Sequence, residues 1–436
     1  MQQTSQLLRG NYLYNRNSYI AAGEPMIFHC HHYNVYLQAV IEDTSSYLHV
    51  YPMLSDSSQE IVYTQFSNFF EEKNNQNLSI EDKKQVCQDY FRFCGFGIID
   101  LTNLTKEGGQ VVAPYEHYGI GWKTKFGLRQ KNKKGVAFFA AGYIAGATEA
   151  IFGLPLGTLF TEQKKCISKG DTKSVFEVST RQNNNILDED EENEINLVPS
   201  PQEGEYQTYK LKNPSNTTID YQAIRQALTN MDLQGDVKTG LINAFGVLLT
   251  RMYANYYCLI SYKLLRLFEG EMGNDGLPLA AQLLTEAGHI CAYNTFGGVM
   301  QSTEWNAMIK PMIQDKEDWV HGITAVVNAF GWGFWEIEKL EPNKQLKMKV
   351  VSGYESNNYL AHFDTHTELP ISFLAAGGVS GIMNLIYNTS ITEDFMTLDE
   401  KEYRKLVQNS SFFTAQKQIC RVKQHSQFDE IEVTSK

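Results

Sequence analysis

The residues whose types and spacing most directly suggest chemistry stand together at positions 28–34, in the order Phe-His-Cys-His-His-Tyr-Asn. Imidazole and thiolate groups bind zinc, iron or copper, and imidazole also transfers protons near neutral pH. On a strand, His29 and His31 would face one side, and Cys30 and His32 the other. Three interpretations follow: a transition-metal or haem site, general acid–base catalysis without a metal, or buried polar groups that satisfy the backbone.

No other established catalytic motif accompanies this cluster. The sequence contains no nucleophile elbow, Walker loop, dinucleotide fingerprint or HExxH pair. An enzyme hypothesis therefore depends on the segment from His29 to His32.

The elements that must position these residues are organised around a repeat. Residues 135–178 return in altered form within residues 369–433, where Ala375-Ala376-Gly377 matches Ala140-Ala141-Gly142 at an offset of 375 − 140 = 235. A repeat of such a long period indicates two copies of one unit. The first copy begins with an apolar helix over 136–152. Its small residues allow a backbone or a ligand to approach closely, although each glycine lowers the stability of the helix by about 1 kcal/mol relative to alanine.

Further matched blocks precede this helix in the same order. They pair 95–97 with 331–333, 111–116 with 350–355, and 29–34 with 289–294. We therefore expect two domains of one fold that form an intramolecular pseudo-dimer. The expected boundaries are a polar arm at 1–25, a first domain at 26–180, an acidic Asn-rich linker at 181–205 and a second, divergent domain at 206–436.

Periodicity predicts the individual elements. We expect a strand or turn that leads into a helix at 26–40, two helices within 58–94, strands within 96–116, and a hairpin at 161–178. In the second half, apolar residues from Leu241 to Leu267 at spacings of three and four predict a long helix, followed by helices at 277–287 and 308–328 and by strands at 330–338 and 345–354.

Composition limits the class of protein. With 436 residues, 42% hydrophobic and 12% aromatic, the chain can bury substantial cores. A net charge of −12 argues against nucleic-acid partners, so the basic stretch at 123–134 is interpreted as a solvated loop, and no apolar run reaches the roughly 18 to 20 residues of a membrane span. Seven cysteines without a CxxC pair and a polar N-terminus favour a reduced, cytoplasmic protein.

The first copy carries three short motifs. They are Gly119-Ile120-Gly121-Trp122, the small-residue helix with its Glu149, and Cys166-Ile167-Ser168-Lys169-Gly170-Asp171 followed by Phe176-Glu177-Val178. In these motifs the chain resembles the 4-vinyl-reductase domain family, whose superfamily includes the sensory domains of phenol- and xylene-responsive activators and the TRAPP subunits. The resemblance covers roughly 26–180 and, more weakly, 240–433.

This resemblance implies an α/β domain, with a small antiparallel sheet packed with helices, that often dimerises and holds a small apolar or aromatic ligand. It also implies a zinc ion held by a helix glutamate and hairpin cysteines, which correspond here to Glu149 and Cys166. The second hairpin cysteine is absent near Ser174, and Asn384 replaces the glutamate in the second copy. Since zinc normally takes four ligands, these two alone do not form a site.

The candidate site residues follow from these considerations. Zinc or another transition metal would be bound by His29, His31, Glu149 and Cys166. An aromatic pocket for the ligand would be lined by Tyr115, His117, Trp122, Tyr143, Trp332 and Tyr354.

Three functions remain open. The first is a cytoplasmic sensor or carrier of a small apolar or aromatic molecule that acts through a partner protein or as a homodimer. The second is a metal-dependent enzyme with its site at His29–His32. The third is a scaffold that uses the helix from Leu241 to Leu267 as an interface and retains only vestigial pockets.

Overall fold

The computed structural model describes residues 10–181, 208–363, 367 and 369–435. Residues 10–181 form the first half of the molecule. Its elements are β1 (Asn11–Leu13), β2 (Ser18–Ala21), β3 (Glu24–Cys30), α2 (His31–Asp43), α3 (Val50–Glu71), α4 (Ile80–Phe93), β4 (Gly97–Asp100), β5 (Gly108–Glu116), α5 (His117–Phe126), α6 (Phe138–Phe152), β6 (Leu159–Lys165), η1 (Ile167–Lys169) and β7 (Ser174–Thr180).

The second half comprises the described residues from 208 to 435. Its elements are α7 (Tyr221–Thr229), β8 (Ile242–Ala244), β9 (Val247–Tyr253), α8 (Ala254–Met272), η2 (Gly273–Asp275), α9 (Gly276–Met300), α10 (Thr303–Met308), η3 (Lys310–Met312), α11 (Lys316–Ala329), β10 (Phe334–Glu341), β11 (Gln345–Val351), α12 (Tyr354–Phe363), α13 (Phe373–Tyr387), α14 (Glu400–Val407), β12 (Phe413–Ile419), α15 (Arg421–Gln424) and β13 (Asp429–Ser435).

The order of elements from β3 to β7 recurs from β9 to β13, with η2, α10, η3 and α14 added in the second half and α15 in the place of η1. The predicted α/β class, with small antiparallel sheets packed with helices, is confirmed. The predicted duplication and domain boundaries stay predictions. The acidic part of the predicted linker, residues 182–205, lies outside the described residues.

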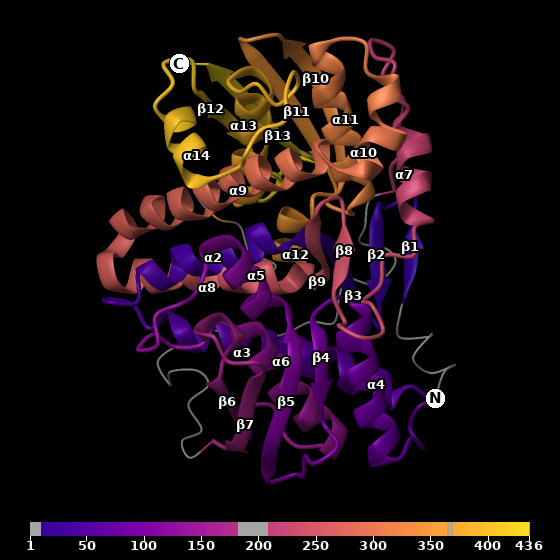
Figure 1. Cartoon of the computed structure of the whole chain (residues 1–436), viewed down its shortest axis with the longest axis vertical. Coiled ribbons are helices and arrows are strands. Elements are labelled where there is room, and N and C mark those ends of the chain that lie inside the picture. Colours follow the sequence, from indigo (N-terminus) through magenta and orange to yellow (C-terminus); the bar gives the residue numbers. More distant parts are fainter. Residues whose placement is uncertain (1–9, 182–207, 364–366, 368, 436) are drawn as a thin grey trace.

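Three antiparallel sheets build the described part of the molecule (Figure 1). The first half contains the sheet β4-β5-β7-β6, and the second half contains β10-β11-β13-β12. A five-stranded sheet, β1-β2-β3-β9-β8, lies between them and takes strands from both halves. Strands β1 and β2 of this central sheet fall within the segment expected to be a polar arm.

The two halves are joined reciprocally. Strand β3 pairs with β9, with His29 opposite Thr250. The Phe28 N–H donates to Phe330 O at 3.0 Å, and the Arg251 N–H donates to Cys94 O at 2.8 Å. Strand β3 of the first half is thus hydrogen-bonded to the segment before the β10–β11 hairpin of the second half. In the same way, β9 of the second half is hydrogen-bonded to the segment before the β4–β5 hairpin of the first half. Helix α2 accordingly packs on α9, and α8 packs on α3.

The small-residue helices lie against long helices of their own halves, α6 on α3 and α13 on α9. A Cβ at Gly142 would lie 2.0 Å from Ser55 O, and one at Gly377 would lie 2.0 Å from Thr285 O. The predicted close approach of a backbone is therefore confirmed. The contact also supports the sequence match of the two helices, because the two glycines sit at the same offset of 235 that aligns the copies.

The glycine block before the hairpins is matched correctly as well. Gly95 and Gly97 have φ of 84° and 118°, and Gly331 and Gly333 have φ of 83° and 108°. The next matched block is out of register. Gly97 packs on Tyr115 O whereas Gly333 packs on Ser352 O, so 111–116 corresponds to 348–353 rather than to 350–355.

Two other sequence expectations are wrong. Residues 242–253 form β8 and β9 rather than the start of a long helix, because an apolar run that is buried on both faces resembles a helix stripe. The remaining apolar residues of that stripe lie on α8, where Tyr256 and Leu259 are buried and Leu267 is partly buried against the core. Most of this stripe is therefore core, and its use as an interface stays a prediction.

The match of the histidine cluster with 289–294 is also wrong. His29 lies near the end of a strand, whereas His289 lies in the middle of α9. The counterpart of His289 in the first half is Gln59. Gly146 of α6 packs against the carbonyl of Gln59, and the matching Gly381 of α13 packs against the carbonyl of His289.

Among the described residues, no helix combines the length and the apolar character needed to cross a bilayer.

The close contact of Gly142 with the Ser55 carbonyl predicts that even a methyl group at this position strongly destabilises the protein. Gly142→Ala would place a methyl group 2.0 Å from Ser55 O and 2.7 Å from Ser58 Cβ. We expect the free energy of unfolding in urea to fall by about 3 kcal/mol. Gly270→Ala in α8 is the control, since its Cβ would meet no atom within 4 Å. That change should stabilise the protein by about 0.5 to 1 kcal/mol, and equal stability of both variants would contradict the packing.

Candidate functional site

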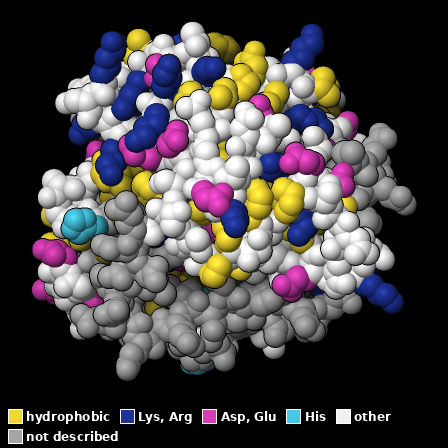
Figure 2. Space-filling model, turned by 90° about the horizontal axis from the view of Figure 1, so that it is seen from below, with side chains coloured by type: hydrophobic (Ala, Val, Ile, Leu, Met, Phe, Trp, Pro, Cys, Tyr) yellow, Lys and Arg dark blue, Asp and Glu magenta, His cyan; other side chains and the backbone are white. Residues whose placement is uncertain are grey.

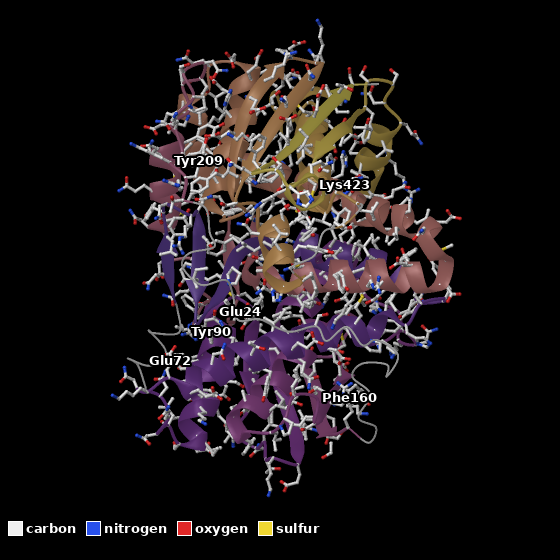
Figure 3. All side chains as sticks on the ribbon, turned by 180° about the vertical axis from the view of Figure 1, so that it is seen from behind. Glu24, Glu72, Tyr90, Phe160, Tyr209 and Lys423 are labelled. Atoms are coloured by element: carbon white, nitrogen blue, oxygen red, sulfur yellow. The ribbon has the colours of Figure 1, made fainter. Side chains whose placement is uncertain are left out.

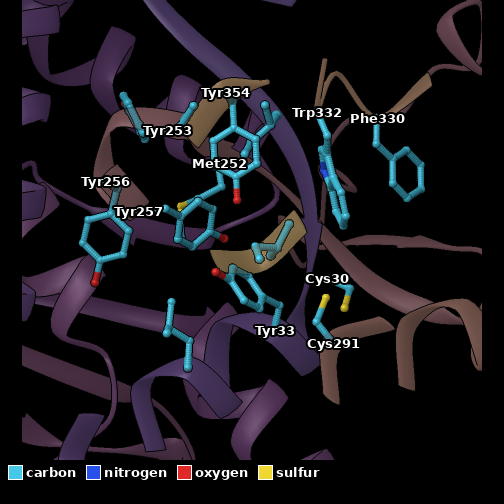
Figure 4. Packing of buried hydrophobic residues seen from close by; sticks show 14 of the residues in the cluster. Cys30, Tyr33, Met252, Tyr253, Tyr256, Tyr257, Cys291, Phe330, Trp332 and Tyr354 are labelled. Carbon is cyan, nitrogen blue, oxygen red and sulfur yellow. The ribbon is translucent and has the colours of Figure 1, made fainter. Parts of the chain in front are cut away.

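His29 lies near the end of β3 and is only 1% exposed. Its ring stacks between Tyr33 and Trp332, each with centroids 4.5 Å away, and meets the edge of Tyr257 at 4.9 Å. Neither ring nitrogen has a hydrogen-bond partner among the described residues, and burial holds the pKa of His29 well below its usual value. We call His29, Tyr33, Tyr257, Trp332 and Tyr354 the His29 box. Figure 4 shows its four aromatic members Tyr33, Tyr257, Trp332 and Tyr354.

A second group of polar side chains adjoins this box and centres on Asn34 of α2. Its Nδ2 donates to His117 Nε2 at 3.0 Å and to Thr250 Oγ1 at 3.2 Å. Its Oδ1 accepts a hydrogen bond from the hydroxyl of Tyr257. Asn34 thus connects the first turn of α2 with α5, β9 and α8, and it holds His117 as a neutral acceptor.

His31 and His32 open the first turn of α2, so the strand alternation expected for the cluster ends at Cys30. Their rings lie 3.9 Å apart, and His31 Nδ1 accepts the Leu248 N–H at 3.2 Å. Burial lowers the pKa of His31 to about 4 and that of His117 to about 3. The imidazoles of His31 and His117 are therefore uncharged at neutral pH.

The four predicted metal ligands do not come together. Glu149 Oε1 accepts hydrogen bonds from Gln59 Nε2 at 2.9 Å and from the Leu159 N–H at 2.8 Å. Cys166 Sγ lies 2.9 Å from Ser168 Oγ, and no described group of three or more His, Cys, Asp or Glu side chains could hold a metal ion. The residues present therefore do not fit the zinc site that the resemblance implies, because a serine stands near the position of its second cysteine and Glu149 accepts a hydrogen bond from the Gln59 amide.

The six predicted ligand residues divide between several places. Trp332 and Tyr354 belong to the His29 box, and His117 is linked to it through Asn34. The others lie elsewhere: Tyr143 is in the core with its hydroxyl on Cys87 O at 2.8 Å, Trp122 packs under the Arg129 guanidinium at 4.5 Å, and Tyr115 is 39% exposed.

The box has no room for an organic ligand. The cavity beside it, lined by Tyr33, Tyr257, Tyr354 and Glu355, has a volume of about 20 Å³. Such a volume accommodates a single water molecule. The box is thus a packed aromatic core between the halves.

A much larger space lies in the first half, between α3, α6 and the edge strand β6. We call it the α3–α6 groove, and its volume is about 630 Å³. Its apolar walls are Tyr51, Pro52, Ala137, Phe138, Ala141 and Phe160. Figure 3 shows Phe160, which lies on β6, at the edge of the lower sheet. A space of this volume can hold a molecule with one or two aromatic rings.

Charged side chains surround these walls. They are Lys134, Lys164, Lys169 and Arg181 with Asp56 and Glu162, which leaves a net charge of 4 − 2 = +2. Asp56 pairs with Arg181 at 2.9 Å, and Glu162 pairs with Lys164 at 2.6 Å. Lys134 and Lys169 have no carboxylate partner among the described residues. Figure 2 shows several Lys and Arg side chains at the upper left of the lower face, with others scattered across it.

The groove connects to Glu149, the glutamate of the small-residue helix α6. Arg181 Nη2 donates to Gln59 Oε1 at 3.2 Å, and Gln59 in turn donates to Glu149. Burial raises the pKa of Glu149, and the Gln59 amide opposes this shift. The glutamate thus positions Gln59 and, through it, the charged end of the groove.

Sequence reasoning missed the groove residues. The basic stretch that ends at Lys134 is interpreted from the sequence as a solvated loop, yet Lys134 Nζ lies 4.6 Å from the Tyr51 ring centroid at the groove. Lys169 and Arg181 carry no signal of their own, since single basic residues near turns are common on protein surfaces.

Comparison with known proteins adds little. No protein-family model matches the chain, and no curated protein does. Among solved structures, the phenol-responsive sensory domain of the transcription activator PoxR with phenol is similar, with a TM-score of 0.35 and 15% identity over 41% of this chain and 90% of that one. At this level of similarity we draw no functional argument from it, and the predicted partner protein or homodimer stays a prediction.

The buried histidines predict acid sensitivity. The unfolded chain binds protons on histidine below about pH 6.5, whereas folded His31 and His117 bind them only near pH 4 and 3. The free energy of unfolding should therefore fall as pH drops below 6.5, by up to about 1.4 kcal/mol per pH unit for each histidine, and these two groups should add no slope above that pH.

Urea titrations at pH 7, 6 and 5 measure this effect. His117→Gln should reduce the slope by one histidine's share. His49→Gln, at an exposed position, serves as the control and should keep the wild-type slope. An unchanged slope in the His117 variant would show that its imidazole is already protonated in the folded state.

Proposed function

We propose that this protein binds a small apolar or aromatic molecule bearing a negative charge in the α3–α6 groove, and that it acts as a sensor or carrier of that molecule. The observation that carries the proposal is the groove itself, about 630 Å³ with aromatic walls and a positive rim. Ligand sites in proteins typically occupy roughly 300 to 1,000 Å³ and combine apolar walls with a few polar groups.

The charge of the groove supports the anionic part of the proposal. The protein carries a net charge of −12, yet the groove carries +2. Such a local reversal attracts anions and disfavours cations. Lys134 and Lys169, which have no carboxylate partner in the described part of the chain, are free to meet a carboxylate, sulfonate or phenolate group.

The walls of the α3–α6 groove support the apolar or aromatic character of the proposed ligand. Phe138 comes from the first turn of α6 and Phe160 from β6, so the groove is bounded by a helix and a sheet edge. Phe138 also stacks with Tyr51 of α3, with centroids 5.3 Å apart. An aromatic ligand would extend this stack and remove apolar surface from water.

Two matched fluorescent probes test the proposal. They are 1-anilinonaphthalene-8-sulfonate, which is aromatic and anionic, and N-phenyl-1-naphthylamine, which has the same rings without the charge. The double variant Lys134→Gln/Lys169→Gln should weaken the sulfonate by roughly five- to tenfold, about 1 to 1.4 kcal/mol, and leave the neutral probe unchanged. The dissociation constants are measured by titration of the full chain.

A blocking variant and a control complete the experiment. Ser55→Trp would fill the groove from α3 and should weaken both probes, whereas Lys106→Gln, at an exposed site away from the groove, should change neither. Probe binding that is insensitive to all the groove variants would sink the proposal.

A further inference from the structure

Two cysteine thiols lie side by side at the junction of the halves (Figure 4). Cys30 ends β3 of the first half, and Cys291 lies in α9 of the second. Thr295 Oγ1 lies 2.7 Å from Cys30 Sγ and 3.4 Å from Cys291 Sγ, so one hydroxyl contacts both sulfurs. Both side chains are 1% exposed, and neither is joined to another cysteine.

The surroundings of the two thiols differ. Cys30 occupies the N-cap position of α2, at the positive end of the helix dipole. The Lys125 ammonium group, which donates a hydrogen bond to Asn294 Oδ1, also interacts electrostatically with Cys30. Cys291 lies in the interior of α9, away from either end of that helix dipole. A helix N-terminus and a nearby lysine are the features that make a cysteine nucleophilic.

We propose that Cys30 and Cys291 form a reversible disulfide that locks the two halves together when the protein meets hydrogen peroxide. The proposal is independent of ligand binding in the α3–α6 groove. It rests on the adjacency of two thiols from different halves and on the asymmetry of their surroundings.

The chemistry proceeds in two steps. The Cys30 thiolate attacks peroxide, so that an S–O bond forms, the O–O bond breaks, and hydroxide leaves with the electron pair of the broken bond. This hydroxide takes up the proton that Cys30 released and becomes water, and the sulfur is oxidised by two electrons. The Cys291 sulfur then attacks the Cys30 sulfenic acid. The S–S bond forms, the S–O bond breaks, and the released hydroxide takes the Cys291 proton as water. In sum, two thiols and one peroxide give one disulfide and two waters.

Hydrogen peroxide is the oxidant that suits the site. Because both sulfurs are almost fully buried, a bulky disulfide reagent would require the halves to separate, whereas peroxide is little larger than water. The new bond would join residues that are 291 − 30 = 261 positions apart. A cross-link over so long a loop restricts the unfolded chain strongly, and we expect the melting temperature to rise by about 5 °C.

Peptide mapping of the full chain tests the proposal. The protein is treated with peroxide, unfolded, alkylated with N-ethylmaleimide and digested. We expect a cross-linked peptide that contains Cys30 and Cys291, a loss of two hydrogens in the intact mass, and recovery of both alkylated thiols after reduction. Full alkylation of both cysteines after peroxide, or a cross-link of Cys30 to another cysteine, would overturn the proposal.

Two serine variants provide the comparison. Cys291→Ser should abolish both the cross-link and the rise in melting temperature while leaving Cys30 as a sulfenic acid, which sulfenic-acid reagents label once the protein is unfolded. Cys258→Ser removes a different buried cysteine, on α8, and should still form the cross-link. If Cys291→Ser fails to fold, peptide mapping of the wild-type chain at increasing peroxide doses provides the test instead. At the doses that link Cys30 to Cys291, the other five cysteines should still react with N-ethylmaleimide, and their loss at the same doses would overturn the proposal.

Discussion

The pairing of β3 with β9 is the interaction on which the rest of the molecule depends. These two strands come from different halves, and their antiparallel register sets His29 opposite Thr250 and Cys30 opposite Leu249. This register positions α2 against α9 and α8 against α3, so each half contributes helices to the core of the other. The His29 box, the Asn34 network and the adjacent thiols all lie on this junction.

The two halves use one packing geometry for different chemistry. In both, glycines bring a small-residue helix against a long helix, and the side chains at the contact correspond. The first half places Gln59 there, bonded to Glu149 and Arg181 at the groove. The second half places His289 there, bonded to Asn384 at 3.0 Å and to Tyr403 of the additional helix α14 at 2.8 Å. The second contact is therefore covered by an element that the first half lacks.

Aromatic residues alone did not identify a ligand site. The rings of Tyr33, Trp332 and Tyr257 lie within 5 Å of His29 and leave about 20 Å³ beside them, which makes the His29 box a core. The α3–α6 groove has fewer rings but far more space, and its charges are only partly paired. Space and unpaired charge, more than aromatic content, distinguish a site that admits a ligand from a well-packed interior.

The sequence by itself determined the local features of this protein. Small residues along 136–152 predicted a helix that a backbone or a ligand could approach closely, and their repeat at 375–377 matched a second such segment. The glycines of 95–97 were matched correctly with those of 331–333, and the α/β class followed from the resemblance carried by residues 119–122, 142–149 and 166–178. Such features depend on periodicity and on backbone freedom, which a short segment carries within itself.

Only the tertiary structure decided which residues meet. The sequence placed 242–253 in a helix, because a strand buried on both faces shows no alternation of polar and apolar residues. It grouped His29 with His31, Glu149 and Cys166 as metal ligands, whereas folding surrounded His29 with Trp332 and Tyr257. Lys134, Lys169 and Arg181 come from the loop before α6, the end of η1 and the residue after β7, and they converge on one groove. Convergence of this kind is set by the packing of helices on sheets, and no spacing along the chain records it.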